Sequence, residues 1–305
     1  MIKLGLIGYP LEHSLSPIIH GAALKSCSLD GNYTLFPIHP DDKQGLKDLL
    51  VRVRNGDITG FNVTIPHKQN VIELLDELTS TAKAIGAVNT IYLRNNKLVG
   101  DNTDAMGFFA DLERFLHNHK SSTFAPHAHL PWRAVPGSAG VVNRQSAIVL
   151  GSGGSARAVV YALLKDGWNV TLAARRFEQA KQLAESFTNY QLPITDYKLS
   201  TIDLSKISLI VNTTPVGMAP NIDRSPWPEN IPFPPHASVY DLVYNPRETK
   251  LVRDACLQGL SATTGLGMLI EQAALAFEIW TGKNPARNIL FESAGATPAT
   301  DQDPG

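Results

Sequence analysis

Short apolar runs alternate with amphipathic stretches along the first third of this chain. Runs typical of strands occupy residues 3–8, 32–38, 58–65 and 87–93, and a turn at 94–97 leads into a short apolar segment at 98–100. Residues 16–27 and 70–84 have the spacing of helices, and another helical pattern extends from residue 104 to about 116. Because strands and helices alternate, the pattern predicts an α/β domain with a mixed sheet.

The pattern stops between about residues 117 and 146, where the chain is rich in Pro, Ser and His. A segment without periodicity predicts a long surface loop or linker. It contains four histidines, and the H-x-H pairs among them lack neighbouring carboxylates or cysteines, which favours a polar loop over a metal site. These residues are His117, His119, His127 and His129.

A second alternating region begins after this segment. An apolar run at 147–150 leads into "GSGGSARA", a helical pattern at 158–167 and another strand-like run at 169–175. Gly151, Gly153 and Ala156 fit G-x-G-x-x-[G/A] between strand and helix, where glycines let a pyrophosphate approach the backbone N–H groups of a helix start. The pattern favours a Rossmann-type, doubly wound dinucleotide-binding domain over a turn used only for packing.

The end of the second strand of this unit indicates which dinucleotide binds. An NAD-binding unit places Asp or Glu there for the ribose 2′-OH, whereas this chain has Arg175 and Arg176. Two guanidinium groups suit the 2′-phosphate of NADP, although a pair of surface arginines at a helix start is the plainer alternative. We therefore predict NADP as the cofactor.

Two more strand-like runs, at 208–214 and 238–246, end in polar or Gly/Pro-rich residues. Since ligands of open α/β sheets bind beyond the carboxyl ends of the strands, four residues there should face the crevice. They are Thr213, Thr214, Leu242 and Tyr244. The last amphipathic pattern, at 267–282, places Met268 and Gln272 on one helix face by their i, i+4 spacing.

Composition narrows the class of protein further. The 305 residues are 43% hydrophobic and 18% charged, with a net charge of −1, which indicates a soluble chain of about two domains and argues against nucleic-acid and membrane partners. The two cysteines, Cys27 and Cys256, lie far apart and fit a reducing compartment. The first ten residues read as a strand and not as a signal peptide, so we expect a cytoplasmic protein.

One lysine has an awkward predicted position. Lys68 follows "GFNVTIPH" and opens the helical pattern, at the positive end of the helix dipole, where a cation is disfavoured. A solvated surface lysine is the simplest explanation. The position also suits a group that takes up and releases a proton.

Eight ordered motifs cover nearly the whole chain and resemble the shikimate dehydrogenase family. They are "HSLSP" (13–17), "NVTIPHK" (62–68), "GAVNT" (86–90), "DNTDAMG" (101–107), "GSGGSARA" (151–158), "NTTPVGM" (212–218), "DLVYNP" (241–246) and "GLGMLIEQ" (265–272). The resemblance implies NADP-linked interconversion of shikimate and 3-dehydroshikimate, a small-molecule substrate, and a monomer or homodimer. It also implies a substrate domain at 1–104 that a C-terminal helix at 266–290 completes, a connecting helix and loop at 105–146, and a Rossmann domain at 147–265.

The resemblance also implies roles for individual residues. Lys68 and Asp104 resemble the catalytic pair, although Asp104 alone would also suit a helix N-cap. Ser14 and Ser16 resemble the carboxylate-binding serines; spaced i, i+2 in an extended segment, they would present hydroxyls to one side, with Ser16 capping the helix before Pro17. The substrate-binding set is Ser14, Ser16, Thr64, Asn89, Asp104, Tyr244 and Gln272. The cofactor-binding set is Gly151, Ser152, Gly153, Gly154, Ser155, Ala174, Arg175, Arg176, Thr213, Thr214, Leu242, Gly265 and Met268.

The chain departs from the family in two places. The family commonly has Asn-Arg-Thr where this chain has Ala174-Arg175-Arg176, which removes a polar contact near the ribose and adds a charge. The segment at 117–146 is also longer than the usual connection. A quinate/shikimate dehydrogenase that prefers NAD should have an acid immediately after "ARR", where Phe177 stands before Glu178. A non-catalytic NADP-sensing protein of the same fold would have no need to keep both Lys68 and Asp104.

Overall fold

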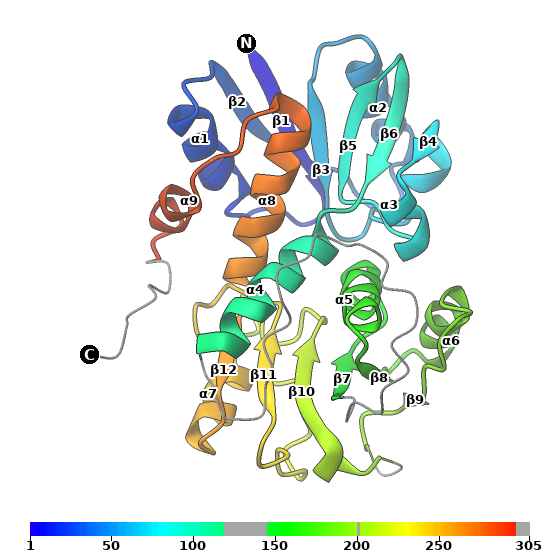
Figure 1. Ribbon diagram of the computed structural model, residues 1–305. Coiled ribbons are helices and arrows are strands. Elements are labelled where there is room, and N and C mark those ends of the chain that lie inside the picture. The colour runs from blue at the N-terminus through cyan, green and yellow to red at the C-terminus, as the bar shows by residue number, and fades with distance from the viewer. Residues whose placement is uncertain (119–144, 200–201, 297–305) are drawn as a thin grey trace.

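Two lobes, each built on its own six-stranded sheet, make up the part of the chain that the computed structural model describes, residues 1–118, 145–199 and 202–296. Figure 1 shows sheet A in the upper lobe and sheet B in the lower lobe. Helices α4 (Asp104–Asn118) and α8 (Leu266–Thr281) cross where the lobes meet (Figure 1). The α/β fold class predicted from the sequence is confirmed.

Sheet A is mixed. Strand β1 pairs in parallel with β2 and β3, whereas β5 is antiparallel to β3 and β6. The last five residues of β1 are buried, as expected of a parallel strand that is covered on both faces. In spatial order the strands are β2 (Gly31–Pro37), β1 (Ile2–Gly8), β3 (Gly60–Val63), β5 (Thr90–Arg94), β6 (Lys97–Asp101) and β4 (Glu77–Leu78).

Sheet B is parallel throughout. In spatial order its strands are β9 (Ile194–Thr195), β8 (Asn169–Ala173), β7 (Ser146–Leu150), β10 (Ile207–Asn212), β11 (Ser238–Asp241) and β12 (Ala262–Thr264). The chain runs outward from β7 to β9, returns to β10 beside β7, and then runs outward the other way. This is the Rossmann strand order, and the reversal between β7 and β10 is where such sheets bind ligands.

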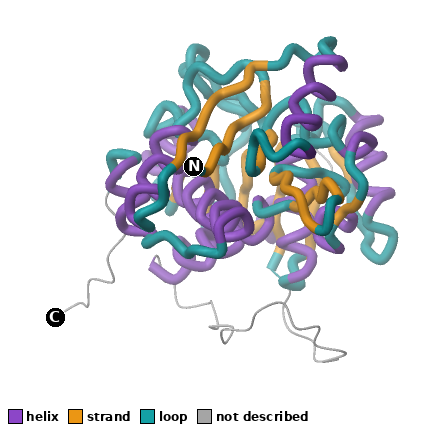
Figure 2. The backbone as a smooth tube through the Cα atoms, turned by 90° about the horizontal axis from the view of Figure 1, so that it is seen from above, coloured by secondary structure: helices purple, strands orange, loops and turns teal. Residues whose placement is uncertain are grey.

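Helices cover both faces of both sheets, and Figure 2 shows from above how they flank the strands. On sheet A, α2 (Lys43–Arg54) covers one face, and α1 (Ser16–Ser26), α8 and α9 (Arg287–Ser293) cover the other. On sheet B, α4, α5 (Gly154–Lys165) and α6 (Phe177–Ser186) pack on one face and α7 (Lys250–Leu257) on the opposite one. Among the described residues, no helix is long and apolar enough to cross a membrane.

The single helix predicted at 70–84 is wrong. The segment forms a turn, a short 3-10 helix η1 (Ile72–Leu74), strand β4 and helix α3 (Ser80–Ile85). The middle of this segment pairs with β6 as strand β4, and the Asp76 carboxylate accepts a hydrogen bond from the Leu98 N–H at 2.7 Å. Thr79 then caps α3 by accepting from the Ala82 N–H at 3.2 Å. Pairing with the sheet therefore overrides the helical periodicity.

The C-terminal helix predicted at 266–290 is also wrong in its extent. Helix α8 ends at Thr281, because Gly282 adopts a left-handed conformation with φ of 67° and Pro285 follows soon after. A separate helix, α9, begins at Arg287. A second 3-10 helix, η2 (Leu204–Lys206), precedes β10. Of the four histidines in the Pro-, Ser- and His-rich segment, only His117 is described; His119, His127 and His129 lie outside the described residues.

Candidate active site

Lys68 and Asp104 form an ion pair where the two lobes meet. The Lys68 ammonium donates to Asp104 Oδ2 at 2.5 Å, and the two residues are only 8% and 4% exposed. The other carboxylate oxygen, Oδ1, accepts from Asn89 Nδ2 at 2.9 Å. Burial excludes the solvated surface lysine that was the plainer alternative for Lys68.

The position of Lys68 differs from the prediction. It lies in a turn after β3 and not in the first turn of a helix, so the helix dipole does not explain its placement. The turn is fixed by the Val88 N–H, which donates to the Lys68 carbonyl at 2.7 Å, and by the His67 N–H, which donates to the Thr64 carbonyl at 2.9 Å. These bonds hold the lysine stem while its ammonium reaches Asp104, the first residue of α4.

Asn89 connects this pair to the rest of the site. Its side-chain oxygen accepts from the Thr103 N–H at 2.8 Å and from the Thr90 hydroxyl at 2.9 Å. Its amide nitrogen lies within 3.2 Å of three acceptors, on Thr103, Asp104 and Gln272. The amide has two protons for these three acceptors. Because the Gln272 contact is the longest, the Gln272 side chain is the most readily available to a ligand.

Hydroxyl groups gather at the opposite end of the site. Burial raises the pKa of Tyr244, and the Leu15 backbone and the Ser14 side chain oppose that rise, so Tyr244 lies beside Ser14. Burial also raises the pKa of Tyr33 well above its ordinary value, opposed mainly by a hydrogen bond with the Ser16 side chain. The side chains of both predicted serines thus meet a tyrosine. Such a cluster of hydroxyls suits a carboxylate ligand.

The local conformation predicted for the two serines is wrong. Ser16 is the first residue of α1 and Leu15, in a helical conformation, is the N-cap, so the segment is not extended and Ser16 is not the cap. The Ser14 hydroxyl instead accepts from the Ser16 N–H at 3.2 Å, which satisfies one of the free donors at the helix start. Pro17, predicted at the first helical position, is the second residue of α1.

Three polar residues of this region were not predicted from the sequence. Tyr33 donates from its hydroxyl to Asn62 Oδ1 at 2.9 Å, and the Asn62 amide donates to the Asn89 carbonyl at 3.2 Å. His67, only 1% exposed, contacts the Ile38 carbonyl through Nε2 at 2.7 Å and so ties the Lys68 turn to the end of β2. Polar residues inside the motif "NVTIPHK" were the available signal for Asn62 and His67, whereas no pattern singled out Tyr33.

The glycine turn lies at the strand reversal of sheet B. Gly151 has a φ of +112°, and a Cβ on it would lie 2.7 Å from Thr213 Oγ1, so only glycine fits there. Gly153 has nothing within 4 Å of an added Cβ among the described residues, and its own lack of a side chain leaves the N–H groups at the start of α5 uncapped. An uncapped helix start beside open space fits a dinucleotide pyrophosphate.

The glycine turn also touches the ion pair. A Cβ on Gly154 would lie 3.0 Å from the Lys68 Cβ, so the first turn of α5 packs directly against the lysine stem. Ser152 is buried and Ser155 half-buried in the same turn. The candidate cofactor turn and the candidate catalytic lysine, far apart in sequence, are therefore brought together.

The remaining residues of the predicted cofactor set occupy the ends of three strands. Ala174 is buried after β8, and Arg175 and Arg176 follow it at exposed positions. Burial raises the pKa of Tyr197, and the two arginines are close enough to oppose that rise. Thr213 and Thr214 follow β10, and both hydroxyls already donate at 2.7 Å, to the Leu150 carbonyl and to Asn212. Leu242 follows β11 and contacts Gly265, while Met268 is buried in the core against sheet B.

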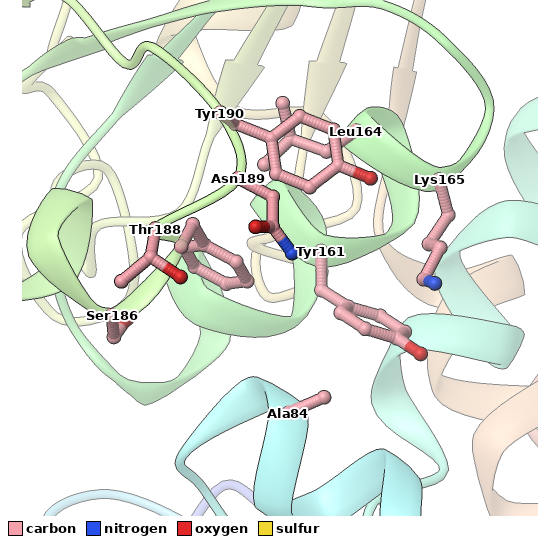
Figure 3. A pocket seen from close by; sticks show the side chains of 9 residues that line it. Ala84, Tyr161, Leu164, Lys165, Ser186, Thr188, Asn189 and Tyr190 are labelled. Carbon is pink, nitrogen blue, oxygen red and sulfur yellow. The ribbon is translucent and has the colours of Figure 1, made fainter.

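A pocket of about 190 Å³ lies elsewhere, between α3, α5 and the segment after α6 (Figure 3). Tyr161 and Lys165 of α5 face Asn189 and Tyr190 across it, and Ala84 of α3 borders it from the upper lobe. No member of the predicted site lines this pocket. In the described part of the chain, no group of three or more His, Cys, Asp or Glu residues is arranged to hold a metal ion.

Two family models match the chain. The shikimate dehydrogenase substrate binding domain matches residues 6–91, and the shikimate 5′-dehydrogenase C-terminal domain matches residues 265–289. The NADP⁺ shikimate dehydrogenase of Methanococcus maripaludis strain C7 is 39% identical over 285 residues, which cover 92% of each chain. The chain belongs to the shikimate dehydrogenase family. The Salinibacter ruber shikimate dehydrogenase is 37% identical, over 95% of this chain and 96% of that protein.

Solved shikimate dehydrogenases have the same two-lobed fold. A crystal structure in complex with NADP⁺ has a TM-score of 0.80 and 35% identity, covering 96% of this chain and 94% of the other. The Thermus thermophilus enzyme, in complex with NADP(H) and shikimate, has a TM-score of 0.78 and 34% identity, with 97% and 99% covered. A family likeness over nearly the full length thus includes both sheets and the junction between them.

Proposed function

We propose that this protein is an enzyme that interconverts shikimate and 3-dehydroshikimate with NADP⁺ or NADPH as the redox partner, on the route to aromatic amino acids. The observation that carries the proposal is the buried Lys68–Asp104 pair, packed against the glycine turn of sheet B. The oxidation of an alcohol requires a group that takes the hydroxyl proton beside a bound dinucleotide that takes the hydride. The contact between Lys68 and the glycine turn fits this requirement. Relatives of this chain are named NADP⁺ shikimate dehydrogenases.

The chemistry divides between the cofactor and the chain. A bound NADP⁺ would supply the acceptor for the hydride that leaves C3 of shikimate. Lys68, as the neutral amine, takes the proton of the C3 hydroxyl and becomes the ammonium, which returns the proton when 3-dehydroshikimate is reduced. Asp104 accepts the hydrogen bond of the Lys68 ammonium at 2.5 Å and so keeps Nζ turned toward the reacting hydroxyl. Burial excludes water from the pair, which strengthens this orientation.

Other residues of the predicted set would hold the substrate. We assign the carboxylate to the hydroxyls of Ser14, Ser16 and Tyr244, and the ring hydroxyls to Thr64, Asn89, Asp104 and Gln272. The support is that these residues converge. Ser16, assigned to the carboxylate, lies beside Tyr33, which donates to Asn62. Asn62 in turn donates to the Asn89 carbonyl, and the Asn89 amide donates to Asp104. The proposed substrate region comprises residues 1–104 and the segment 266–290, with residues 105–146 as the connection.

Residues 147–265 would bind NADP. The pyrophosphate would contact the N–H groups of Gly151, Ser152, Gly153, Gly154 and Ser155, and the 2′-phosphate would contact Arg175 and Arg176 beyond Ala174. Thr213, Thr214, Leu242, Gly265 and Met268 would border the nicotinamide end. We further infer a cytoplasmic protein, because Cys27 and Cys256 are both free thiols.

One spectrophotometric assay tests the function. The purified protein is given shikimate with NADP⁺, shikimate with NAD⁺, and quinate with each cofactor, and the absorbance of the reduced nicotinamide is followed. We expect the highest kcat/KM with shikimate and NADP⁺. A higher value with NAD⁺ and quinate would show the alternative enzyme of the same family, and no turnover with any pair would exclude the proposed function.

A further inference from the structure

Helix α8, which carries Met268 and Gln272, begins without a cap of its own. Its N-cap residue is Gly265, which has no side chain to accept a hydrogen bond, and its first turn contains no acid. The first N–H groups of a helix have no acceptor within the helix and need one from outside. A carboxylate of another helix lies at this end of α8.

That carboxylate belongs to Asp111, on α4. The Met268 backbone N–H opposes the rise in the pKa of Asp111 and so lies near it, and Met268 is the third residue of α8, the position that an N-cap side chain ordinarily binds. Gly267 permits this approach, because a Cβ on it would lie 1.9 Å from Asp111 Oδ1. The Asp111 carboxylate thus lies in the place of an N-cap side chain, across the helix pair and at the positive end of the helix dipole.

The Asp111 side chain is itself held from two sides. Tyr240, at the end of β11, donates from its hydroxyl to Oδ2 at 2.5 Å, and Arg114 donates to Oδ1 at 3.0 Å. Asp111 is only 8% exposed, and burial raises its pKa while the Tyr240 hydroxyl opposes that rise. A buried carboxylate with this many donors has a single orientation.

The cap has consequences for the substrate site. Helices α4 and α8 pack so closely that a Cβ on Gly107 would lie 2.7 Å from the Gln272 backbone nitrogen. Gln272 Oε1 lies 3.2 Å from Asn89 Nδ2, which also donates to Asp104 at 2.9 Å. A shift of the start of α8 along α4 would therefore move Gln272 relative to Asn89 and Asp104.

We propose that Asp111, oriented by Tyr240, is a positioning residue for substrate binding: by capping α8 from α4 it holds Gln272 against Asn89 and Asp104. The inference rests on the proposed function, since it assigns Gln272 to the substrate. Neither Asp111 nor Tyr240 belongs to the predicted site. Both act through α8 and not by contact with the substrate.

The test is a double-mutant cycle with steady-state kinetics. Asp111→Asn keeps the shape and removes the charge, and we expect it to raise the KM for shikimate about tenfold, the equivalent of one hydrogen bond to a charged group. Tyr240→Phe should raise it about threefold by releasing the carboxylate. In a Gln272→Ala background, Asp111→Asn should add less than about a twofold further rise, because the residue that it positions is gone.

Asp254→Asn is the matched control. It removes a carboxylate paired with Lys250 at 2.6 Å on α7, away from α8, and should leave the KM for shikimate unchanged. Equal effects of Asp111→Asn with and without Gln272 would overturn the proposal, as would a lower Tm with an unchanged KM. If Asp111→Asn does not fold, the same cycle with Tyr240→Phe decides.

Wild-type turnover in the same assays separates the two claims. If the wild-type protein does not oxidise shikimate with NADP⁺, the proposed function fails, and the cap is then tested by amide hydrogen exchange. Faster exchange at Met268 in Asp111→Asn than in Asp254→Asn supports the cap. Equal exchange in the two variants would exclude it.

Discussion

At the scale of single residues, the exposed Arg175 and Arg176 after β8 bear on which dinucleotide is preferred. NADP differs from NAD by one phosphate, and a guanidinium binds a phosphate through parallel charge-assisted hydrogen bonds. The same side chain provides no acceptor for the bare 2′-OH of NAD. Arg175 and Arg176 should therefore act on NADP alone.

Arg175→Ala should raise the KM for NADP⁺ roughly tenfold to a hundredfold and leave the KM for NAD⁺ nearly unchanged, because one or two charge-assisted bonds to the 2′-phosphate are lost. The measurement is the KM of each cofactor at saturating shikimate. Arg253→Ala removes an exposed arginine from α7 in the same lobe and serves as the control. A similar rise for both cofactors would mean that Arg175 has only a structural role.

The carboxylate assignment is tested at the same scale. Ser14→Ala combined with Ser16→Ala should weaken shikimate binding by about 1–3 kcal/mol, since each hydroxyl contributes one bond to a charged group. NADPH binding, followed by its fluorescence, should persist because the glycine turn lies in the other lobe. Ser26→Ala, on the exposed side of α1, is the control. Unchanged shikimate affinity would place the carboxylate elsewhere.

At the scale of elements, α1 contacts both β2 and α8 of the upper lobe through the His20 ring. Its ring stacks on Tyr33 of β2 at a centroid distance of 4.3 Å and lies 6.4 Å from Phe277 and 5.5 Å from Trp280, both on α8. His20 is 1% exposed, and neither ring nitrogen makes a hydrogen bond of normal geometry within the described residues. Burial lowers its pKa from 6.5 to about 3, and the Asn62 side chain only partly opposes this.

This packing predicts a dependence of stability on pH. The unfolded chain protonates His20 below pH 6.5, whereas the folded chain protonates it only near pH 3. The contribution of the neutral, buried His20 ring to the free energy of unfolding is therefore fully present above pH 6.5 and is lost as the pH falls. Between pH 6.5 and pH 5 the loss should be about 2 kcal/mol. His20→Phe should flatten the free energy of unfolding over that interval, whereas His13→Gln, at an exposed position, should not. Parallel curves for His20→Phe and the wild-type protein would contradict this.

Individual elements show how far the sequence could predict the structure. The strand–turn–helix unit at the glycines follows from local rules, because the backbone at Gly151 and the start of α5 depend on neighbouring residues. The turn that holds Lys68 does not. It is fixed by bonds to Val88 and Ile38, which lie far away in sequence, and the same is true of β4, which pairs with the edge of β6. Helical periodicity is read from a short window of residues and therefore cannot reveal partners that lie far away in sequence.

The candidate site shows the same limit. The motifs identified Lys68, Asp104 and the two serines, since each occurs in a recognisable run of residues. They did not identify Tyr33, which reaches Asn62 from the outer strand β2, or Asp111, which acts through another helix. Residues that position others lack a local signature, because their role depends on the packing of α4, α8 and sheet A.

At the scale of the whole molecule, the two lobes place different chemistry on opposite sides of one junction. The segments that follow β3 and precede β5 of sheet A provide Lys68 and Asn89. The glycine turn follows β7 of sheet B, and α4 begins at the junction with Asp104. Contact between Gly154 and the Lys68 stem brings the two sides together. We infer that Lys68 transfers the substrate proton at this junction.

Steady-state kinetics of Lys68→Met at saturating NADP⁺ test this claim most directly. Met keeps the length of the side chain and removes the amine, so kcat should fall by roughly 10²–10⁴, the range for loss of a general acid–base group. The KM for shikimate should change much less, because the carboxylate and other hydroxyl contacts remain. Lys181→Met, at an exposed position on α6, should match the wild-type protein. A kcat near the wild-type value with a greatly raised KM would make Lys68 a binding residue and contradict its role in proton transfer.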